Sequence, residues 1–263
     1  MNATRLGKAA ISGPGKAALS TGIAGSALTA LSSAPGQMAH LFRRRFPTVA
    51  VTGMTGVGKT RLADRLAKHA SSDAVDAGSA VMERRTKHSS RLHGFRFRVV
   101  PGDNAATRLG ALDEVFHDDP VDGVLHVVAY GHATPRRTGG TSGAAEQRTR
   151  EEQLAAELED WSITAHRIAA MCVRRDRPVW LVIVVTKADL FANDIDAAVR
   201  YYSPGSGSPF AAKLDELRAL AGGARLSIDV LPVSAENDSK STKELSKLLT
   251  TLENRMAQLS GHV

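Results

Sequence analysis

Short apolar runs alternate along this chain with longer segments in which apolar residues recur every three or four positions. Five of the runs predict strands, at residues 48–52, 92–100, 121–130, 179–185 and 226–233. Residues 179–185, VWLVIVV, are apolar throughout, which is typical of a strand buried on both faces of a parallel sheet. Residues 92–100 alternate instead, so Phe95, Phe97 and Val99 are expected on one face and arginines on the other.

The segments between the strands show helical periodicity. Helices are predicted at residues 59–70, 105–116, 144–174, 210–220 and 240–259. The longest of them carries an apolar stripe formed by Leu154, Leu158, Trp161, Ala165, Ile168 and Cys172. Three polar segments, residues 71–90, 131–143 and 200–209, are predicted to connect the elements, the first of them flexibly.

This alternation of strands and helices predicts an α/β fold. We expect a doubly wound, mostly parallel sheet flanked by helices on both faces. Ligands of such sheets bind beyond the carboxyl ends of the strands, so the loops that follow the strands are the expected place for a functional site.

The loop after the first strand is rich in glycine and matches the pattern G-x-x-x-x-G-K-[ST] with Gly53, Gly58, Lys59 and Thr60. Glycine permits backbone angles that let successive N–H groups converge on an anion, and the helix that begins near Lys59 directs its positive end to the same place. Lys59 supplies a charge for the β- and γ-phosphates, and the Thr60 hydroxyl is a predicted ligand of Mg²⁺. The predicted phosphate-contacting residues are Gly53, Thr55, Gly56, Val57, Gly58, Lys59, Thr60 and Arg61.

Further motifs follow the later strands. The sequence TKAD, which ends at Asp189, comes directly after residues 179–185. Ser234 and Ala235 follow the last strand, and a Pro-Gly pair that ends at Gly102 breaks the alternating one. Because the carboxyl ends of parallel strands meet at one edge of the sheet, these positions are expected to lie near the phosphate loop.

The order of these motifs, GMTGVGKT, then PG, then TKAD, then SA, resembles the small-GTPase-like family of P-loop proteins, the Era/Ras-like G domains, over residues 46–259. The resemblance implies a P-loop NTPase fold that binds GTP or GDP together with Mg²⁺. It also implies that the Asp189 carboxylate accepts from guanine N1–H and the 2-amino group, that Lys187 packs along the base, and that the Ala235 N–H reaches the guanine oxygen. The further nucleotide-contacting residues that it implies are Gly102, Thr186, Lys187, Asp189, Ser234 and Ala235.

One motif of that family is degenerate in this chain. Its D-x-x-G motif would end at Gly102, which puts Val99 where the resemblance implies an Asp that holds a water on Mg²⁺. Asp103, directly after the glycine, is the predicted replacement, either near the metal or beside the attacking water. The alternative is that Asp103 caps the helix that begins near Ala105.

The first switch loop of the family supplies a Thr to Mg²⁺ and to the γ-phosphate. Thr86 is the predicted equivalent, and Ser89 and Ser90 are the alternatives. The predicted catalytic residues are therefore Lys59, Asp103 and Thr86, and the predicted metal ligands are Thr60 and Thr86. Four arginines are interpreted either as solvated surface charge, which is favoured, or as an arginine finger: Arg84, Arg85, Arg136 and Arg137.

Composition adds a basic N-terminal arm to this picture. The 263 residues carry a formal net charge of +7 and a single cysteine, so a disulfide framework is excluded. Residues 1–46 hold six basic side chains and no acidic one, which leaves +1 for the remainder and argues against a nucleic-acid-binding domain. We expect residues 1–45 to form the arm and residues 46–263 to form the P-loop domain.

Three interpretations of the arm stay open. Its Ala, Gly and Ser content favours a mobile or loosely helical segment, whereas the uncharged stretch 17–42 between basic flanks suits a membrane surface or a partner that orders it. A membrane-spanning helix needs about 20 consecutive apolar residues, and Ser and Gly interrupt this stretch too often. The expected location is cytoplasmic, with peripheral membrane association under the second interpretation.

The favoured function is a nucleotide-dependent switch that hydrolyses GTP slowly and acts on an unidentified protein partner. The alternative is a guanine-nucleotide-binding regulatory or structural module with little or no hydrolysis, which the missing carboxylate at Val99 supports. An ATPase or nucleotide kinase is a third hypothesis. TKAD argues against it, because adenine lacks the paired donors that Asp189 would accept.

Overall fold

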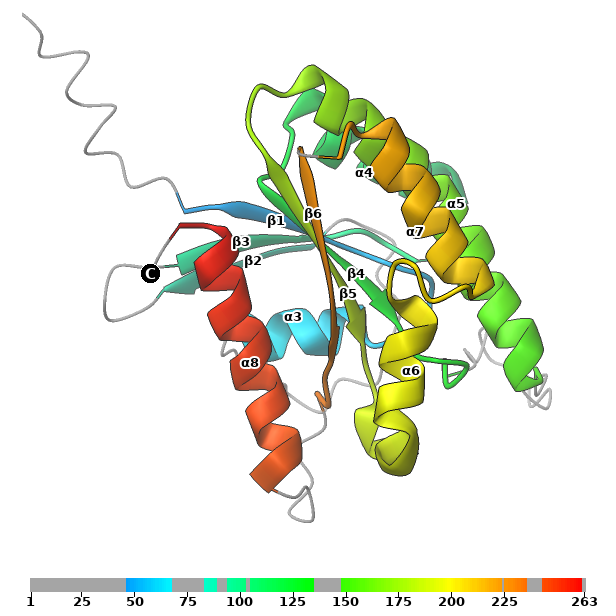
Figure 1. The fold of residues 1–263 in the computed structure, drawn as a ribbon. Coiled ribbons are helices and arrows are strands. Elements are labelled where there is room, and N and C mark those ends of the chain that lie inside the picture. The colour runs from blue at the N-terminus through cyan, green and yellow to red at the C-terminus, as the bar shows by residue number, and fades with distance from the viewer. Residues whose placement is uncertain are drawn as a thin grey trace, which may run out of the picture. The chain divides into compact units, whose positions relative to one another are not determined.

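A six-stranded sheet runs through the chain, with its strands in the order β2-β3-β1-β4-β5-β6 (Figure 1). The strands are β1 (Thr48–Thr52), β2 (Glu83–His88), β3 (Gly94–Val99), β4 (Gly123–Val128), β5 (Val179–Val185) and β6 (Leu226–Pro232). Five of the six are parallel, and β2 is antiparallel to β3. The computed structural model describes residues 46–67, 83–88, 94–102, 105–134, 148–223, 225–235 and 243–261. The predicted N-terminal arm lies outside these residues.

Helices cover both faces of the sheet, which confirms the predicted fold class. Helices α3 and α8 lie on one face, and α4, α5, α6 and α7 lie on the other (Figure 1). Their bounds are α3 (Lys59–Ala67), α4 (Ala105–Asp113), α5 (Arg150–Arg174), α6 (Ile195–Tyr202), α7 (Pro209–Leu220) and α8 (Lys243–Leu259). A π-helical turn, η1 (Glu114–Asp118), continues α4, and a 3-10 helix, η2 (Ala188–Asp194), precedes α6.

Two apolar cores separate the helices from the sheet. Strand β5 contributes to both, because all seven of its residues are buried, as its uninterrupted apolar sequence predicted. Trp161 on α5 and Trp180 on β5 lie in different cores. The apolar stripe of α5, which includes Cys172, faces the core that contains Trp161. Close packing of these large side chains fixes the helices against the sheet and so fixes the loops at its ends.

The alternating strand β3 behaves as predicted, but its partner β2 was missed. Phe95, Phe97 and Val99 are buried and Arg96 is exposed. Residues 83–88, ERRTKH, had been predicted as part of a flexible connection, and they instead form the edge strand that pairs with β3. Sequence periodicity could not reveal this strand, because five of its six residues are charged or histidine and no apolar alternation marks it.

Two helix boundaries also differ from the prediction. Helix α5 begins at Arg150 and not at residue 144, because Thr149 forms a capping box with Glu152: each side chain bonds the backbone N–H of the other residue. The sequence TREE carries this signal. The predicted connection 200–209 is shorter than expected, because α6 extends to Tyr202 and α7 begins at Pro209 after the N-cap Ser208.

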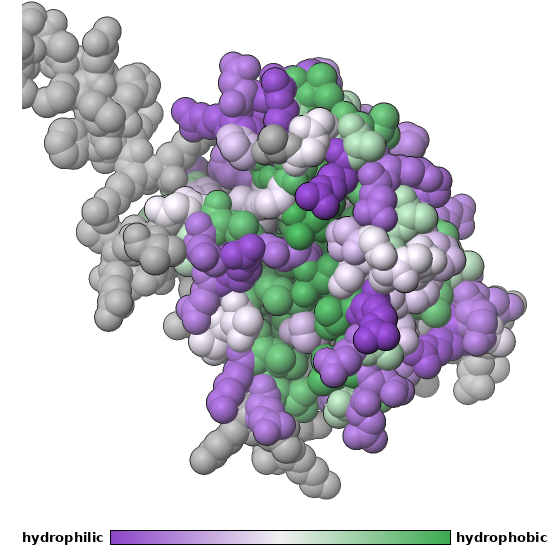
Figure 2. All heavy atoms as spheres, in the orientation of Figure 1, coloured by the Kyte–Doolittle hydropathy of each residue, from purple (hydrophilic) through white to green (hydrophobic). Residues whose placement is uncertain are grey.

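Strand β6 forms the other edge of the sheet. Its middle residues are half-buried, and Figure 2 shows apolar surface on the face where β6 runs in Figure 1. Arg255 of α8 reaches this edge with a forked contact to Asp229, with Nε 2.9 Å from Oδ2 and Nη2 3.1 Å from Oδ1. Among the described residues, no helix is long and apolar enough to cross a bilayer.

Candidate functional site

The predicted motifs occupy the loops at the carboxyl ends of the parallel strands. Strand β1 lies between β3 and β4, while the chain continues from β4 to β5 and β6 on the far side. The direction of winding therefore reverses at β1 and β4, and this switch point is where open α/β sheets bind ligands. The glycine-rich loop, residues 53–58, leaves β1 at that point.

The glycine-rich loop has the backbone that an anion site requires. Gly53, Gly56 and Gly58 all have positive φ, at 129°, 80° and 90°. Helix α3 begins directly after them, so its first N–H groups and its positive dipole end face the loop. Lys59 is 8% exposed and its Nζ donates to Met54 O at 2.8 Å, which holds the ammonium group against the loop.

Gly53 is a position where an alanine should damage the fold. A Cβ at Gly53 would lie 2.2 Å from Val127 O on β4, and the φ of 129° would strain any side chain. We expect Gly53→Ala to lower the free energy of unfolding by about 2–4 kcal/mol. Gly205→Ala is the matched control, because its φ is also positive at 76° but no atom lies within 4 Å of the added Cβ. Gly205→Ala is expected to lower the free energy of unfolding by about 1 kcal/mol. If urea unfolding shows equal losses for the two variants, the steric argument is contradicted.

Thr186 joins the TKAD motif to the glycine-rich loop. Its Oγ1 lies 2.6 Å from Val57 O and 2.9 Å from Val128 O, and its side chain is buried. The hydroxyl therefore bonds the loop after β1 while it also lies against the end of β4. The two motifs are 129 residues apart in sequence and are in direct contact in the structure.

Lys187 makes a second connection between the same loops. Its backbone is left-handed, with φ 59°, a conformation that is uncommon for a residue with a side chain and that clusters at functional sites. Its Nζ donates to His132 O at 2.7 Å and to Thr134 Oγ1 at 2.6 Å. The N–H of Thr134 in turn donates to Gly56 O at 3.0 Å. Lys187 is thus tied to the glycine-rich loop through the loop after β4.

Asp189 and the Ser-Ala pair meet at the end of the same edge. Ser234 Oγ donates to Asp189 Oδ1 at 2.7 Å, so the motif after β6 holds the carboxylate of the motif after β5. Ser234 and Ala235 are buried and Asp189 is partly exposed. The structure thus brings together the predicted residues 53–60, 186–189 and 234–235.

The turn at Gly102 packs directly on the glycine-rich loop. A Cβ at Gly102 would lie 2.6 Å from Thr55 Oγ1 and 2.8 Å from Lys59 Nζ, so glycine lets the turn approach the ammonium group. Val99, where the resemblance implied a carboxylate, is 3% exposed and belongs to the apolar core under α3. Asp103 lies outside the described residues, so both interpretations of it stay predictions.

The prediction that Thr86 lies in a loop is wrong. Thr86 is in the middle of β2, where it pairs with Arg96, and Glu83 is the residue that pairs with Val99 near the site. Position 86 is therefore about 10 Å along the strand from that end of the sheet. Of the four arginines for which an arginine finger was the alternative interpretation, Arg84 and Arg85 lie in the same strand. The other positions considered, Ser89, Ser90, Arg136 and Arg137, lie outside the described residues.

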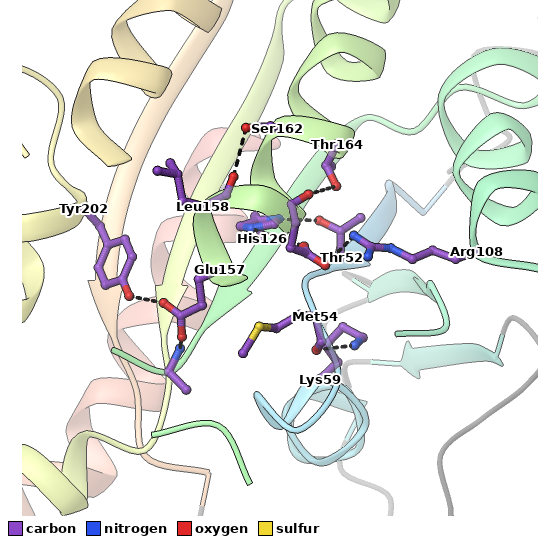
Figure 3. A network of polar contacts seen from close by, with 12 residues as sticks. Thr52, Met54, Lys59, Arg108, His126, Glu157, Leu158, Ser162, Thr164 and Tyr202 are labelled. Atoms are coloured by element: carbon purple, nitrogen blue, oxygen red, sulfur yellow. Dashed lines mark hydrogen bonds and ion pairs between the residues drawn. The ribbon is translucent and has the colours of Figure 1, made fainter. Parts of the chain in front are cut away.

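Sequence reasoning missed a buried polar network beneath the glycine-rich loop (Figure 3). Thr52 Oγ1, at the end of β1, lies 3.0 Å from His126 Nδ1 on β4. The other ring nitrogen, Nε2, lies 4.0 Å from Asp160 Oδ2 on α5, and Asp160 Oδ1 lies 2.5 Å from Arg108 Nη2 on α4. The available signal was a histidine within the apolar run 121–130 and an acidic residue beside Trp161 on the stripe of α5.

A second buried carboxylate on α5 organises the loop after β4. Glu157 Oε1 accepts from the Ala129 N–H at 2.9 Å, and Oε2 accepts from the Tyr202 hydroxyl (Figure 3). Burial raises the pKa of Glu157 above its usual value, against the lowering effect of these hydrogen bonds. Glu157 thus fixes the start of the loop that Lys187 contacts.

His126 should make the protein less stable as the solution becomes acidic. Burial, with the positive charges of Arg108 and Lys59, lowers its pKa from 6.5 to about 3. Between these values the unfolded chain binds a proton that the folded chain does not, so the contribution of neutral His126 to stability is present above pH 6.5 and is lost as pH falls toward 3. The slope approaches about 1.4 kcal/mol per pH unit.

Urea unfolding at several values between pH 7 and pH 4.5 measures this slope. We expect His126→Gln to flatten the curve by about 1 kcal/mol per pH unit. The exposed His117 supplies the control variant, His117→Gln, whose curve should parallel the wild-type curve. Burial raises the pKa values of Glu157 and Asp160, so these carboxylates make stability fall as pH rises. This opposite contribution is present in the wild type and in both variants. A His126→Gln curve parallel to the wild-type curve would refute the assignment.

Similarity to known proteins is weak. A scan against protein-family models finds no match, and a search of the curated proteins finds no relative. Among solved structures, the chain is similar to a GTP-binding protein from the hyperthermophilic archaeon Sulfolobus solfataricus, crystallised in complex with GDP, at 16% sequence identity and a TM-score of 0.44. The match covers 82% of this chain and 52% of that protein, so this chain spans about half of its length. A likeness this distant assigns no function to the chain.

Proposed function

We propose that this protein binds guanine nucleotides at the carboxyl edge of its sheet and hydrolyses GTP slowly. The observation that carries the proposal is the contact between the two motifs: Thr186, three residues before Asp189, bonds Val57 in the loop that precedes Lys59. Phosphate groups at Lys59 and a purine at Asp189 would then belong to one bound molecule.

The phosphate end of the nucleotide would lie in the glycine-rich loop. The backbone N–H groups of residues 53–60 would donate to the phosphate oxygens, and Lys59 would neutralise the β- and γ-phosphates. Thr60 suits Mg²⁺, because that ion commonly takes one or two protein oxygens together with phosphate oxygens and water. When bound, the ion would neutralise negative charge on the phosphates. Gly102, which packs against the loop beside Lys59, would lie near the γ-phosphate.

The base end would lie at the edge formed by the last two strands. Guanine presents two adjacent donors, N1–H and the 2-amino group, and Asp189 offers two acceptor oxygens. The Ser234 hydroxyl holds one of these oxygens in place. Adenine has no such pair of donors, so the site would prefer GTP to ATP because a mismatched base leaves the carboxylate without its partners.

Hydrolysis would proceed by in-line attack of water on the γ-phosphate. Lys59 and the N–H groups of the loop would stabilise the charge that develops on the phosphate oxygens. We assign Asp103 to positioning of the water or of the metal, and we propose that the γ-phosphate changes the turn at Gly102 and thereby presents a surface to a protein partner. The basic arm, residues 1–45, is the segment best suited to add a membrane or partner contact.

A binding module with little hydrolysis is the second candidate function. The observation that favours it is the apolar Val99, which the core buries at the position where the resemblance implied a carboxylate. Both candidates require guanine nucleotide binding and differ in turnover.

Binding and turnover by the purified 263-residue chain separate these candidates. We expect guanine nucleotide to copurify with the protein, and GTP to displace it far better than ATP. Phosphate release with Mg²⁺ that falls in Asp103→Ala would support the slow enzyme, and tight binding without release would support the module. Equal competition by ATP, or failure to bind either GTP or GDP, would overturn the proposal.

A further inference from the structure

A buried ion pair connects α4 to α5 beneath the glycine-rich loop. Arg108 Nη2 on α4 lies 2.5 Å from Asp160 Oδ1 on α5, and the two side chains are 12% and 3% exposed (Figure 3). The charged atoms of both side chains are buried. Removing either partner would therefore leave a costly isolated charge.

Asp160 is also within electrostatic reach of the glycine-rich loop. Burial raises the pKa of its carboxyl group, while the positive charges of Arg108 and then of Lys59 lower it. Its other oxygen lies 4.0 Å from His126 Nε2, and the opposite ring nitrogen lies 3.0 Å from Thr52 Oγ1. Thr52 is the last residue of β1, directly before Gly53. The carboxylate thus lies below the loop and not at its mouth.

The other partner of the pair belongs to the element that follows the Gly102 turn. Helix α4 begins at Ala105, three positions after Gly102, and Arg108 is in its first turn. Gly102 itself packs against Thr55 and Lys59 so closely that a Cβ would lie less than 3 Å from each side chain. The position of α4 on α5 therefore restricts where the Gly102 turn can lie relative to the Lys59 ammonium group.

We propose that Arg108 and Asp160 are positioning residues that hold the Gly102 turn against Lys59 and so set the preference of the site for GTP over GDP. This inference rests on the proposed function. The two nucleotides differ in the γ-phosphate, and the Gly102 turn is next to the lysine that binds it. A change confined to this turn therefore alters the affinity for GTP and leaves the affinity for GDP nearly constant.

The variants Asp160→Asn and Arg108→Lys test the proposal. The first removes the buried negative charge, and the second keeps the positive charge on a shorter side chain. We expect each to lower the ratio of the dissociation constant for GDP to that for a non-hydrolysable GTP analogue by at least about fivefold. The GDP constant itself should change by less than about twofold. Titration with both nucleotides in the presence of Mg²⁺ measures the ratio.

A second ion pair between the same helices supplies the control. Arg167 Nε on α5 lies 2.8 Å from Asp113 Oδ1 at the far end of α4, and these side chains are more exposed, at 27% and 58%. Arg167→Gln should leave the ratio unchanged, because surface pairs contribute little. The double variant Arg108→Lys with Asp160→Glu restores the combined length of the pair and is expected to recover most of the lost ratio.

The outcomes separate this inference from the proposed function. A wild-type chain that binds neither nucleotide refutes the proposed function itself. Wild-type binding of both, with affinities for GDP and GTP that fall equally in the variants, shows that the pair only stabilises the fold and overturns the positioning role. If Asp160→Asn fails to fold, Arg108→Lys and the double variant Arg108→Lys with Asp160→Glu test the positioning role, because both variants keep the buried charges. A ratio that stays constant in Arg108→Lys refutes the inference.

Discussion

Replacing Lys59 by methionine is expected to weaken binding of GTP by about a hundredfold or more, to weaken binding of GDP by about tenfold or more, and to remove hydrolysis. The substitution keeps most of the apolar stem and removes the ammonium group. In the structure that group donates to Met54 O, which holds it against the glycine-rich loop. Each charge-assisted contact to a phosphate contributes about 1.5–3 kcal/mol, and Lys59 would make two of them to GTP and one to GDP.

The Lys59 variant must remain folded for this loss to report on binding. We expect a loss of about 1 kcal/mol in the free energy of unfolding, from the hydrogen bond to Met54. Lys213→Met is the matched control, because Lys213 is an exposed lysine on α7 that pairs with Glu216 away from the site. Fluorescent nucleotide titration and phosphate release measure both variants. A folded Lys59→Met protein that binds GDP as the wild type does would place the phosphates elsewhere.

The placement of the glycine-rich loop and of TKAD at one edge of the sheet was predictable, because each combines a local pattern with a defined place in the fold. Gly53, Lys59 and Asp189 were located from residue type and from the apolar strand before each motif. A parallel sheet then brings the ends of those strands to one edge. The hydrogen bond from Thr186 to Val57 follows from this topology, although its atoms could not be specified from sequence.

The missed features depend on contacts that leave no periodic signal. Strand β2 pairs through its backbone with β3 and needs no apolar face at the edge of the sheet, so the charged sequence around Thr86 was interpreted as a connection. Arg108 and Asp160 come from different helices, and each alone resembles an ordinary surface charge in the sequence. They become unusual only when the packing of α4 on α5 buries both. The packing of these two helices against each other cannot be read from a single sequence.

Asp189→Asn is expected to change the base that the site prefers. Guanine offers two donors to the side chain at position 189, and a carboxylate accepts both. An asparagine has one acceptor and one donor, so one of the guanine donors would face an NH₂ group. Xanthine keeps N1–H but carries an oxygen at C2, which matches the asparagine. We expect GTP affinity to fall by about a hundredfold or more and XTP affinity to rise above it.

Competition among GTP, XTP and ATP for the site measures this exchange. The Asn oxygen or nitrogen can still meet the Ser234 hydroxyl, so the loop is expected to keep its shape and the free energy of unfolding to change by less than about 1 kcal/mol. Asp196→Asn is the control, because it removes the same charge from an exposed carboxylate in the first turn of α6. A site in which Asp189 contacts the base must respond to XTP, whereas a purely structural role for Asp189 weakens GTP and XTP alike. Loss of both in a folded Asp189→Asn protein would therefore remove the base from this edge of the sheet and leave Lys59 as the only anchor of the nucleotide.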